Sequence, residues 1–123
     1  MQDTNGFNDL ERSVLGWYMT HYESPSLRQQ LEAAGFVRRE WTKVGYYTDF
    51  KVPGDLTPVK LLEIGGRWPV DGPFIKARSL QYGGCVILWG QDGYANCMEI
   101  FAYGELFPEG LSEFELIEMS IQE

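Results

Sequence analysis

Residues 84–103, GCVILWGQDGYANCMEIFAY, decide the fold. Two apolar runs, 84–89 and 94–103, flank the segment Gln91-Asp92-Gly93. An Asp-Gly pair between hydrophobic runs is a strong local signal for a β-hairpin, because its tight turn needs residues that tolerate positive φ. The sequence therefore predicts two adjacent antiparallel strands joined at Asp92-Gly93.

The segment before this hairpin has the texture of a sheet, with short β-type runs broken by Gly, Pro and Asp. We expect residues 68–73, WPVDGP, to form a loop, since proline disfavours a central strand. The expected strands in this region are 36–43, 46–52, 59–64 and a short strand at 74–78.

The N-terminal third has helical spacing instead. Asn8 is a suitable N-cap for a helix over 8–22, with acidic residues in its first turn. Ser24-Pro25 is a favourable start for a second helix over 25–34, and Gly35 is a suitable stop.

The last segment, 113–121, carries two opposing signals. Ile117, Met119 and Ile121 alternate with polar residues, which favours a strand, whereas Ser112 and Glu115 form a capping-box pattern, which favours a helix. We predict a strand. The whole chain, 1–123, then forms a single α+β domain with two N-terminal helices on one face of a mostly antiparallel, strongly twisted sheet of five to seven strands.

Composition and length fit a globular domain. Hydrophobic residues make 44% of the 123 residues and aromatic residues 15%, and most of the rings are expected in the core. The first residues are polar and no apolar run approaches the roughly 20 residues of a membrane helix. We therefore expect no signal peptide, no membrane partner and a cytoplasmic location.

The two cysteines lie on the two strands of the predicted hairpin. A two-residue turn pairs Cys85 with Ile100 and Cys97 with Leu88, which places the thiols on opposite faces, whereas a three-residue loop places them on one face but offset. Neither register suits a disulfide, so two reduced, buried thiols are expected.

Charge is divided very unevenly along the chain. All ten basic residues lie at or before Arg78, where ten acidic residues balance them. Residues 79–123 carry eight acidic residues and no basic one, so they hold the whole net charge of −8. An acidic end of this kind attracts positively charged partners and repels phosphates, which argues against direct binding of nucleic acid.

Signatures of catalysis and of cofactors are weak. The single histidine, His21, lies near a predicted helix end, where we expect it to contact the last carbonyls rather than act as a base. One histidine and two cysteines without a metal-ligand spacing predict no metal site, and the Gly-Gly pairs match no phosphate-binding loop. We expect no cofactor and no catalytic residue.

Two stretches resemble a pattern in small uncharacterised bacterial proteins, some of them associated with toxin-immunity systems. In RREWTKVGYYTDF, 38–50, an R-E-aromatic-T segment runs into G-aromatic-aromatic-T-x-F, and after the Asp-Gly hairpin MEIFAYG, 98–104, matches L-E-x-aromatic-x-Y-G. Lys43 replaces an expected Gly and Met98 an expected Leu. The resemblance implies a compact bacterial α+β domain and carries over no catalytic residue.

Glu99 is an unusual member of its predicted strand, a carboxylate between Met98 and Ile100. If it is buried it needs a cation such as Arg39 or Lys43, and if it faces solvent it needs none. The sequence leaves both arrangements open.

These observations lead to one principal hypothesis, a non-enzymatic acidic binding protein of the bacterial immunity type that occludes a basic toxin or nuclease. The acids would steer the basic partner, and the aromatic residues would anchor it if they face outward. The predicted partner-binding residues are Glu105, Glu109, Glu113, Glu115, Tyr94, Tyr103 and Phe107, with Trp89 as a further aromatic anchor.

Two alternatives remain open. The first is a small-molecule-binding or enzymatic domain with an aromatic-lined cavity between the helices and the sheet. Its cavity would be lined by Trp17, Trp41, Tyr46 and Tyr47, with His21 or Glu99 inside. The second is an acidic surface that only promotes solubility.

Overall fold

A computed structural model describes residues 6–118. Two helices precede a six-stranded sheet with the order β1-β2-β5-β4-β3-β6, in which all neighbouring strands are antiparallel. The predicted α+β class is therefore confirmed. The elements are α1 (Asp9–His21), α2 (Pro25–Glu32), β1 (Gly35–Trp41), β2 (Gly45–Lys51), the 3₁₀ helix η1 (Leu61–Ile64), β3 (Val70–Ala77), β4 (Leu80–Gln91), β5 (Tyr94–Ala102) and β6 (Glu115–Ile117).

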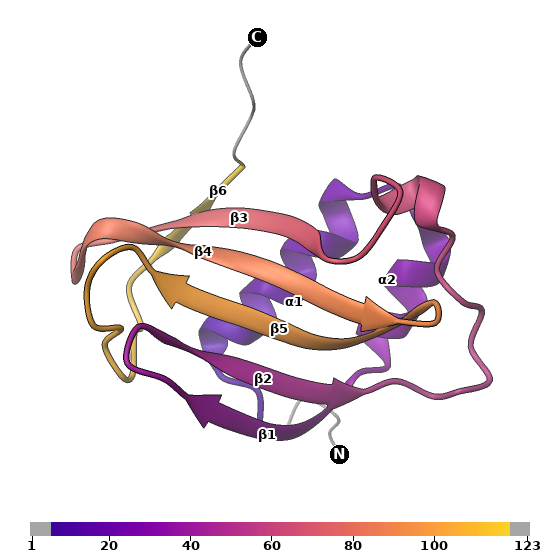
Figure 1. Cartoon of the computed structure of the whole chain (residues 1–123), viewed down its shortest axis with the longest axis horizontal. Helices are drawn as coiled ribbons and strands as arrows, with labels where there is room; N and C mark the ends of the chain where they lie inside the picture. Colours follow the sequence, from indigo (N-terminus) through magenta and orange to yellow (C-terminus); the bar gives the residue numbers. More distant parts are fainter. Residues whose placement is uncertain (1–5, 119–123) are drawn as a thin grey trace, which may run out of the picture.

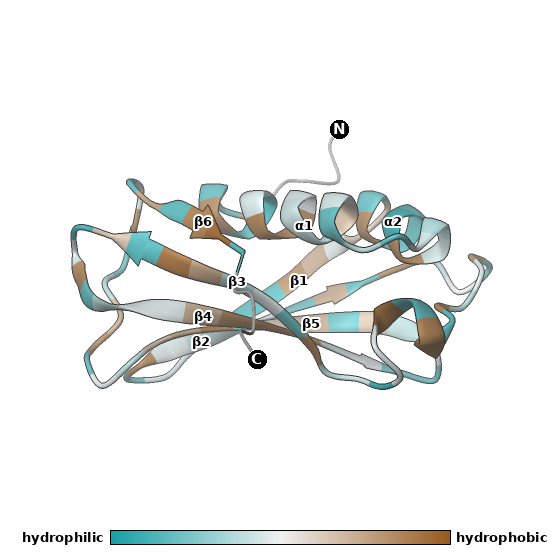
Figure 2. Cartoon of the chain, turned by 90° about the horizontal axis from the view of Figure 1, so that it is seen from above, coloured by the Kyte–Doolittle hydropathy of each residue, from teal (hydrophilic) through white to brown (hydrophobic). Residues whose placement is uncertain are grey.

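The helices and the sheet form two layers. Figure 1 looks onto the sheet with both helices behind it, and Figure 2 shows the helices along one side of the twisted sheet. Alternate residues of the central strands, such as Val86 and Leu88 on β4, are fully buried on the helix side. Among residues 6–118, no helix covers the opposite face of these strands, which we call the open face.

Both helices begin where the sequence predicts. Asn8 caps α1 in a capping box, with its side chain accepting from the Glu11 N–H and the Glu11 side chain accepting from the Asn8 N–H, each at 2.8 Å. Ser24 caps α2 and Pro25 takes its first position. The helices end slightly early, at His21 and Glu32, since the chain needs the following residues to turn into the next element.

Buried polar contacts fix the helices on the sheet. The Tyr18 hydroxyl of α1 donates to the Val70 carbonyl of β3 at 2.9 Å. On α2, the fully buried Gln30 amide donates to the Thr57 and Gly93 carbonyls and accepts from the Ala95 N–H. The amide contacts of Gln30 therefore reach the loop before η1, the β4–β5 turn and the start of β5, and they hold the turn against α2.

The β4–β5 hairpin confirms the predicted turn but not the predicted register. Asp92 and Gly93 have φ of 55° and 90°, as a two-residue turn of this kind requires. A register shift after Trp89 then pairs Cys85 with Phe101 and Cys97 with Trp89. The expected Cys85–Ile100 pairing is wrong because this bulge adds one residue to the count.

The two thiols consequently lie on the open face. Cys97 of β5 is opposite Trp89, which is four residues along β4 from Cys85. Both thiols are free. They are half-buried rather than buried, because they lie on the side of the sheet that the helices do not cover.

Two predicted elements between the hairpins are wrong. The expected strand at 59–64 is instead a loop followed by η1, whose end is marked by Gly65 at φ 93°. The expected loop at 68–73 instead contains the start of β3 at Val70. Pro73 is tolerated there because the β3–β4 register skips from Asp71 to Phe74, so no ladder bond needs its missing N–H.

The C-terminal segment forms the predicted strand over a shorter range. β6 pairs with β3 only over 115–117, opposite Phe74, Ile75 and Lys76. Met119 and Ile121, which contributed to the prediction, lie outside the described residues.

A buried ion pair connects the start of α1 to the first two strands. Glu11 is fully buried and accepts hydrogen bonds from the Arg39 guanidinium at 2.5 and 2.6 Å and from the Thr48 hydroxyl at 2.5 Å. Arg39 also donates to the Gly6 carbonyl and lies over the Phe36 ring. The carboxylate is thus satisfied by groups of β1, β2 and its own helix.

Removal of this carboxylate is expected to destabilise the protein strongly. Glu11→Ala leaves the Arg39 guanidinium and the Thr48 hydroxyl without their partner, at a cost of about 3–5 kcal/mol in the free energy of unfolding. Arg28→Ala is the matched control, since it breaks the exposed Arg28–Glu32 pair and is expected to cost less than about 1 kcal/mol. Urea unfolding measures both values, and equal losses would contradict the assigned role of Glu11.

Two glycine substitutions are expected to act in opposite directions. A Cβ on Gly45 would lie 2.0 Å from the Ile100 carbonyl oxygen of the neighbouring strand, so Gly45→Ala forces β2 and β5 apart and destabilises the protein. A Cβ on Gly16, inside α1, meets nothing within 4 Å, so Gly16→Ala is expected to stabilise by about 0.5–1 kcal/mol. Thermal unfolding would contradict this if both variants moved in the same direction.

Candidate functional site

The structure places the four predicted steering acids at one end of the molecule, but not as an isolated acidic patch. Glu105 is half-buried and accepts from the Tyr82 N–H at 2.9 Å. Glu109, Glu113 and Glu115 are exposed.

Basic residues from β3 and the turn after it share this end. Lys76 is the cross-strand partner of Glu115 and lines a groove with Glu113, and Arg78 lines a neighbouring groove with Glu109. Folding therefore brings cations from the balanced part of the chain to the acidic segment, which weakens its potential.

The three predicted aromatic anchors are not brought together. Phe107 is only 7% exposed and packs against Trp41 and Tyr46, so it does not meet the condition of facing outward that an anchor requires. Tyr94 is half-buried at the far end of β5, with its hydroxyl donating to the Leu56 carbonyl at 2.8 Å. Of these three residues, Tyr103 is the exposed one, and it lies near the acidic segment.

The residues of the predicted aromatic cavity are likewise separated. Trp17 and His21 line a pocket of about 370 Å³ with Asp71, Gly72 and Glu118 among its other walls. The remaining four lie elsewhere. The Trp41 and Tyr46 rings contact each other at a tilt of 40°, with centroids 4.5 Å apart, and Tyr47 and Glu99 lie on the open face.

The geometry of His21 is that of a helix-end imidazole. Its ring stacks on Trp17 with centroids 4.2 Å apart, and Nδ1 lies 2.9 Å from the Trp17 carbonyl oxygen. This confirms the expected contact with a terminal carbonyl. Nε2 lies 3.9 Å from the Glu118 carboxylate, which is an electrostatic contact when the imidazole is protonated.

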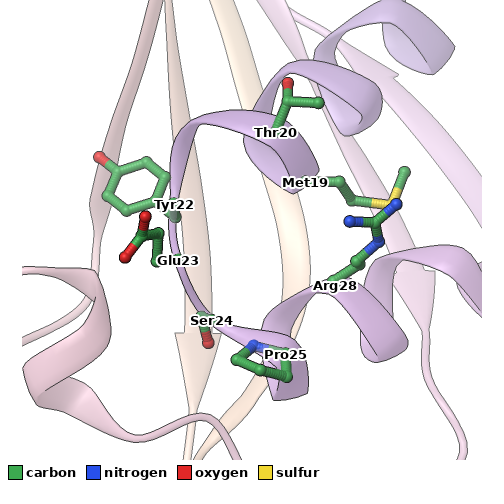
Figure 3. A pocket seen from close by; sticks show the side chains of 7 residues that line it. All are labelled: Met19, Thr20, Tyr22, Glu23, Ser24, Pro25 and Arg28. Atoms are coloured by element: carbon green, nitrogen blue, oxygen red, sulfur yellow. The ribbon is translucent and has the colours of Figure 1, made fainter.

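A wide groove of about 690 Å³ lies at the corner between α1 and α2. Figure 3 shows Met19 and Arg28 on one side of it and Tyr22 and Glu23 on the other. Arg28 is paired with Glu32 of its own helix, and Ser24 caps α2. The polar groups around the groove are therefore engaged in holding the corner together.

The open face presents a different arrangement, in which apolar and acidic side chains alternate. One row of cross-strand partners crosses five strands of the sheet, and the register pairs each member with the next. In order from β1 to β3, the row is Glu40, Tyr47, Glu99, Ile87 and Asp71. Asp71, at the β3 end of the row, also lines the pocket that contains Trp17 and His21.

The three carboxylates of this row are evenly spaced and unpaired. Neighbouring strands lie about 4.8 Å apart, so the carboxylate-bearing strands are roughly 10 Å apart. Among residues 6–118, no Lys or Arg forms an ion pair with Glu40, Glu99 or Asp71. The nearest cation in the register, Arg38, is bound to Asp49 at 2.9 Å.

Glu99 lies at the centre of this row between two aromatic side chains. The Trp89 indole N–H donates to its Oε1 at 3.1 Å. The negative charge of Glu99 is also the main cause that raises the pKa of Tyr47, its cross-strand partner. Tyr47 and Trp89 are 37% and 39% exposed, so their rings remain available to a ligand. Of the two arrangements left open by the sequence, Glu99 adopts the solvent-facing one.

The sequence analysis singled out two members of the row, Glu99 and Tyr47, although it assigned Tyr47 to an internal cavity. It also singled out Trp89, which lies beside the row, but not Glu40, Ile87 or Asp71. Glu40 and Asp71 drew no attention because a single carboxylate on a predicted strand or loop is ordinary. Glu40 and Asp71 are placed in one row with Glu99 by the pairing of β2 with β5 and of β3 with β4. No local sequence pattern indicates these pairings.

The thiols lie beside this row and are not exposed nucleophiles. Burial, followed by the neighbouring Asp49 carboxylate, raises the pKa of Cys97 to about 12. The Cys85 thiol, followed by burial, raises the pKa of Tyr103 to about 12. Both Cys97 and Tyr103 therefore stay protonated at neutral pH.

Comparison with known proteins found no match: neither a family model, nor a curated protein, nor a solved structure matches the chain.

Two further findings concern the described residues, 6–118. None of their helices is both long and apolar enough to span a bilayer. Within the same range, no three His, Cys, Asp or Glu side chains are grouped so as to hold a metal ion.

The raised pKa of Cys97 predicts a slow reaction with alkylating agents. At pH 8 an ordinary cysteine is roughly one-quarter thiolate, whereas a thiol with a pKa of about 12 is thiolate in roughly one molecule in ten thousand. In a Cys85→Ser background, we expect iodoacetamide to modify Cys97 at least about a hundredfold more slowly in the folded protein than in urea.

The rate should also rise about tenfold for each pH unit between 8 and 10, because the thiolate fraction does. Asp49→Asn is expected to increase the rate by removing the second cause of the shift. A folded-state rate equal to the rate in urea would contradict the assigned pKa.

Proposed function

We propose that this chain is a non-enzymatic binding protein for a basic protein and that the open face of its sheet is the binding surface. The proposal rests on the row of three unpaired carboxylates, Glu40, Glu99 and Asp71, interleaved with Tyr47 and Ile87. Tyrosine is one of the residue types enriched among the energetically dominant residues of protein interfaces.

Electrostatics favours a cationic partner over other classes. Carboxylates at intervals of roughly 10 Å are separated by about one Debye length at physiological salt, so their fields overlap only near the surface. Such a surface repels nucleic-acid phosphates and attracts Lys and Arg side chains. The exposed acids Glu109, Glu113 and Glu115 would extend the attraction at the β6 end, in spite of the cations beside them.

An immunity-type inhibitor of a basic toxin or nuclease is the most specific form of this proposal. It is supported by the resemblance of the segments 38–50 and 98–104 to small bacterial proteins, some associated with toxin-immunity systems, and by the acidic open face. Bacterial origin and a cytoplasmic location stay predictions. The two free thiols are compatible with a reducing compartment.

The alternative of a small-molecule-binding or enzymatic domain has less support. Of the six residues assigned to its cavity, Trp17 and His21 share a pocket that the other four do not line, and His21 is engaged with Trp17. A purely solubilising role explains exposed acids but not the exposed rings of Tyr47 and Trp89 among them.

Three charge-matched variants test the proposal. Each replaces three acids by Lys: a face variant at Glu40, Asp71 and Glu99, an end variant at Glu109, Glu113 and Glu115, and a control variant at Glu23, Glu32 and Asp55, which are exposed acids away from the open face. A partner is captured from the native host with the unmodified chain and identified. Its affinity for all four proteins is then measured by calorimetry at two salt concentrations.

We expect the captured partner to be basic and the face variant to weaken binding at least about tenfold, with a smaller dependence on salt. The control variant should stay within about twofold, because the altered charges lie outside the interface. Equal losses in the face and control variants would contradict the proposal, since they would indicate a response to net charge alone. For the inhibitor form, co-expression should also relieve toxicity of the partner.

A further inference from the structure

We propose that Tyr47, Glu99 and Trp89 together form a receptor for one arginine side chain of the partner protein. The inference rests on the proposed function and specifies the group that the open face recognises. The three residues lie on neighbouring strands, β2, β5 and β4, and their side chains share one face. We call them the aromatic clasp.

The carboxylate of the clasp is oriented before any ligand arrives. The indole N–H of Trp89 holds Oε1 of Glu99 at 3.1 Å. The neighbouring strands β2 and β4 place Tyr47 and Ile87 directly opposite Glu99. An oriented acceptor reduces the ordering that binding would otherwise require, which favours affinity.

The rings of the clasp suit a flat cation. Tyr47 and Trp89 keep 37% and 39% of their surface exposed. Burial of these large apolar rings would be more favourable, so their exposure leaves apolar area for a ligand to cover. Arginine is planar, stacks on aromatic faces and donates to a carboxylate through two N–H groups at once. Lysine offers a more strongly hydrated point charge and no such fork, so the clasp favours arginine.

The protein does not fill the clasp with its own cations. Within residues 6–118, Arg38 is bound to Asp49 and Arg39 to Glu11, and neither forms an ion pair with Glu99. Glu40 and Asp71 lie in the same row, two strands away on either side. They add attraction for a cation approaching Glu99 and exclude an anionic ligand.

The test uses a short peptide, acetyl-Gly-Arg-Gly-amide, titrated into isotope-labelled protein and followed by the NMR signals of the four indole N–H groups. The control peptide has citrulline in place of arginine, which keeps the shape and removes the charge. Trp89→Phe identifies the Trp89 signal by its loss. We expect the arginine peptide to shift the Trp89 signal selectively and the citrulline peptide to leave it unchanged.

Two variants separate recognition from general attraction. Glu99→Gln keeps the size of the side chain and is expected to weaken the peptide about tenfold, as loss of a charge-assisted contact predicts. Asp55→Asn removes an exposed acid outside the open face and should leave the titration unchanged. Because Glu99 is solvent-facing, its variant is expected to fold, which circular dichroism verifies.

The outcomes distinguish the clasp from the wider binding function. Loss of partner binding in the face variant, combined with no peptide shift and no effect of Glu99→Gln, would overturn the clasp and leave the binding surface standing. A selective, Glu99-dependent shift without any basic partner would support the clasp and overturn the proposed function. A Trp89 signal that moves with protein concentration alone would assign the face to a second copy and overturn the assignment to a partner protein.

Discussion

The buried carboxylate of Glu11 is the contact on which the arrangement of the molecule depends. A fully buried charge is tolerated only with a cation and hydrogen bonds around it, and here Arg39, Thr48 and the Asn8 N–H supply them. These groups belong to β1, β2 and the cap of α1. Satisfying one side chain therefore fixes where the first helix lies against the first hairpin.

The same contact shapes the electrostatics of the other side of the sheet. Side chains alternate along a strand, so Arg39 directed inward places Arg38 and Glu40 outward. Arg38 is then bound to Asp49, which leaves no arginine of β1 for the row that contains Glu99. The inner ion pair thus removes one cation from the surface and leaves the open face acidic at its centre.

Local chemistry was sufficient to predict the caps, the Asp-Gly turn and the α+β class, because each depends on a few consecutive residues. The strand register was not predictable in the same way. The ring of Trp68 packs against Gly90, where an added Cβ would lie 2.5 Å from the nearest ring atom. Gly90 is next to the register shift that changes the expected cross-strand partners of the β4–β5 hairpin. A contact between residues so far apart in sequence leaves no local pattern.

The candidate site shows the same division between local and distant information. Glu99 was recognisable as a carboxylate among apolar neighbours, but its surroundings depend on which face β2 presents. Thr48 bound to Glu11 turns Tyr46 and Thr48 inward and therefore Tyr47 outward, so Tyr47 joins Glu99 instead of the expected internal cavity. The orientation of one buried hydroxyl thus decides the membership of the surface row.

Net charge along the sequence does not by itself show which surface of the folded protein carries unpaired negative charge. The C-terminal segment carries the largest excess of acids, yet Lys76 and Arg78 lie beside Glu109, Glu113 and Glu115 once β3 pairs with β6. The open face holds fewer acids, but the row from Glu40 to Asp71 contains no cation. The exposed rings of Tyr47 and Trp89 lie beside Glu99 and would exclude water from part of its contact with a bound cation. An attraction between charges strengthens as water is excluded, so this face has the stronger claim to a cationic partner.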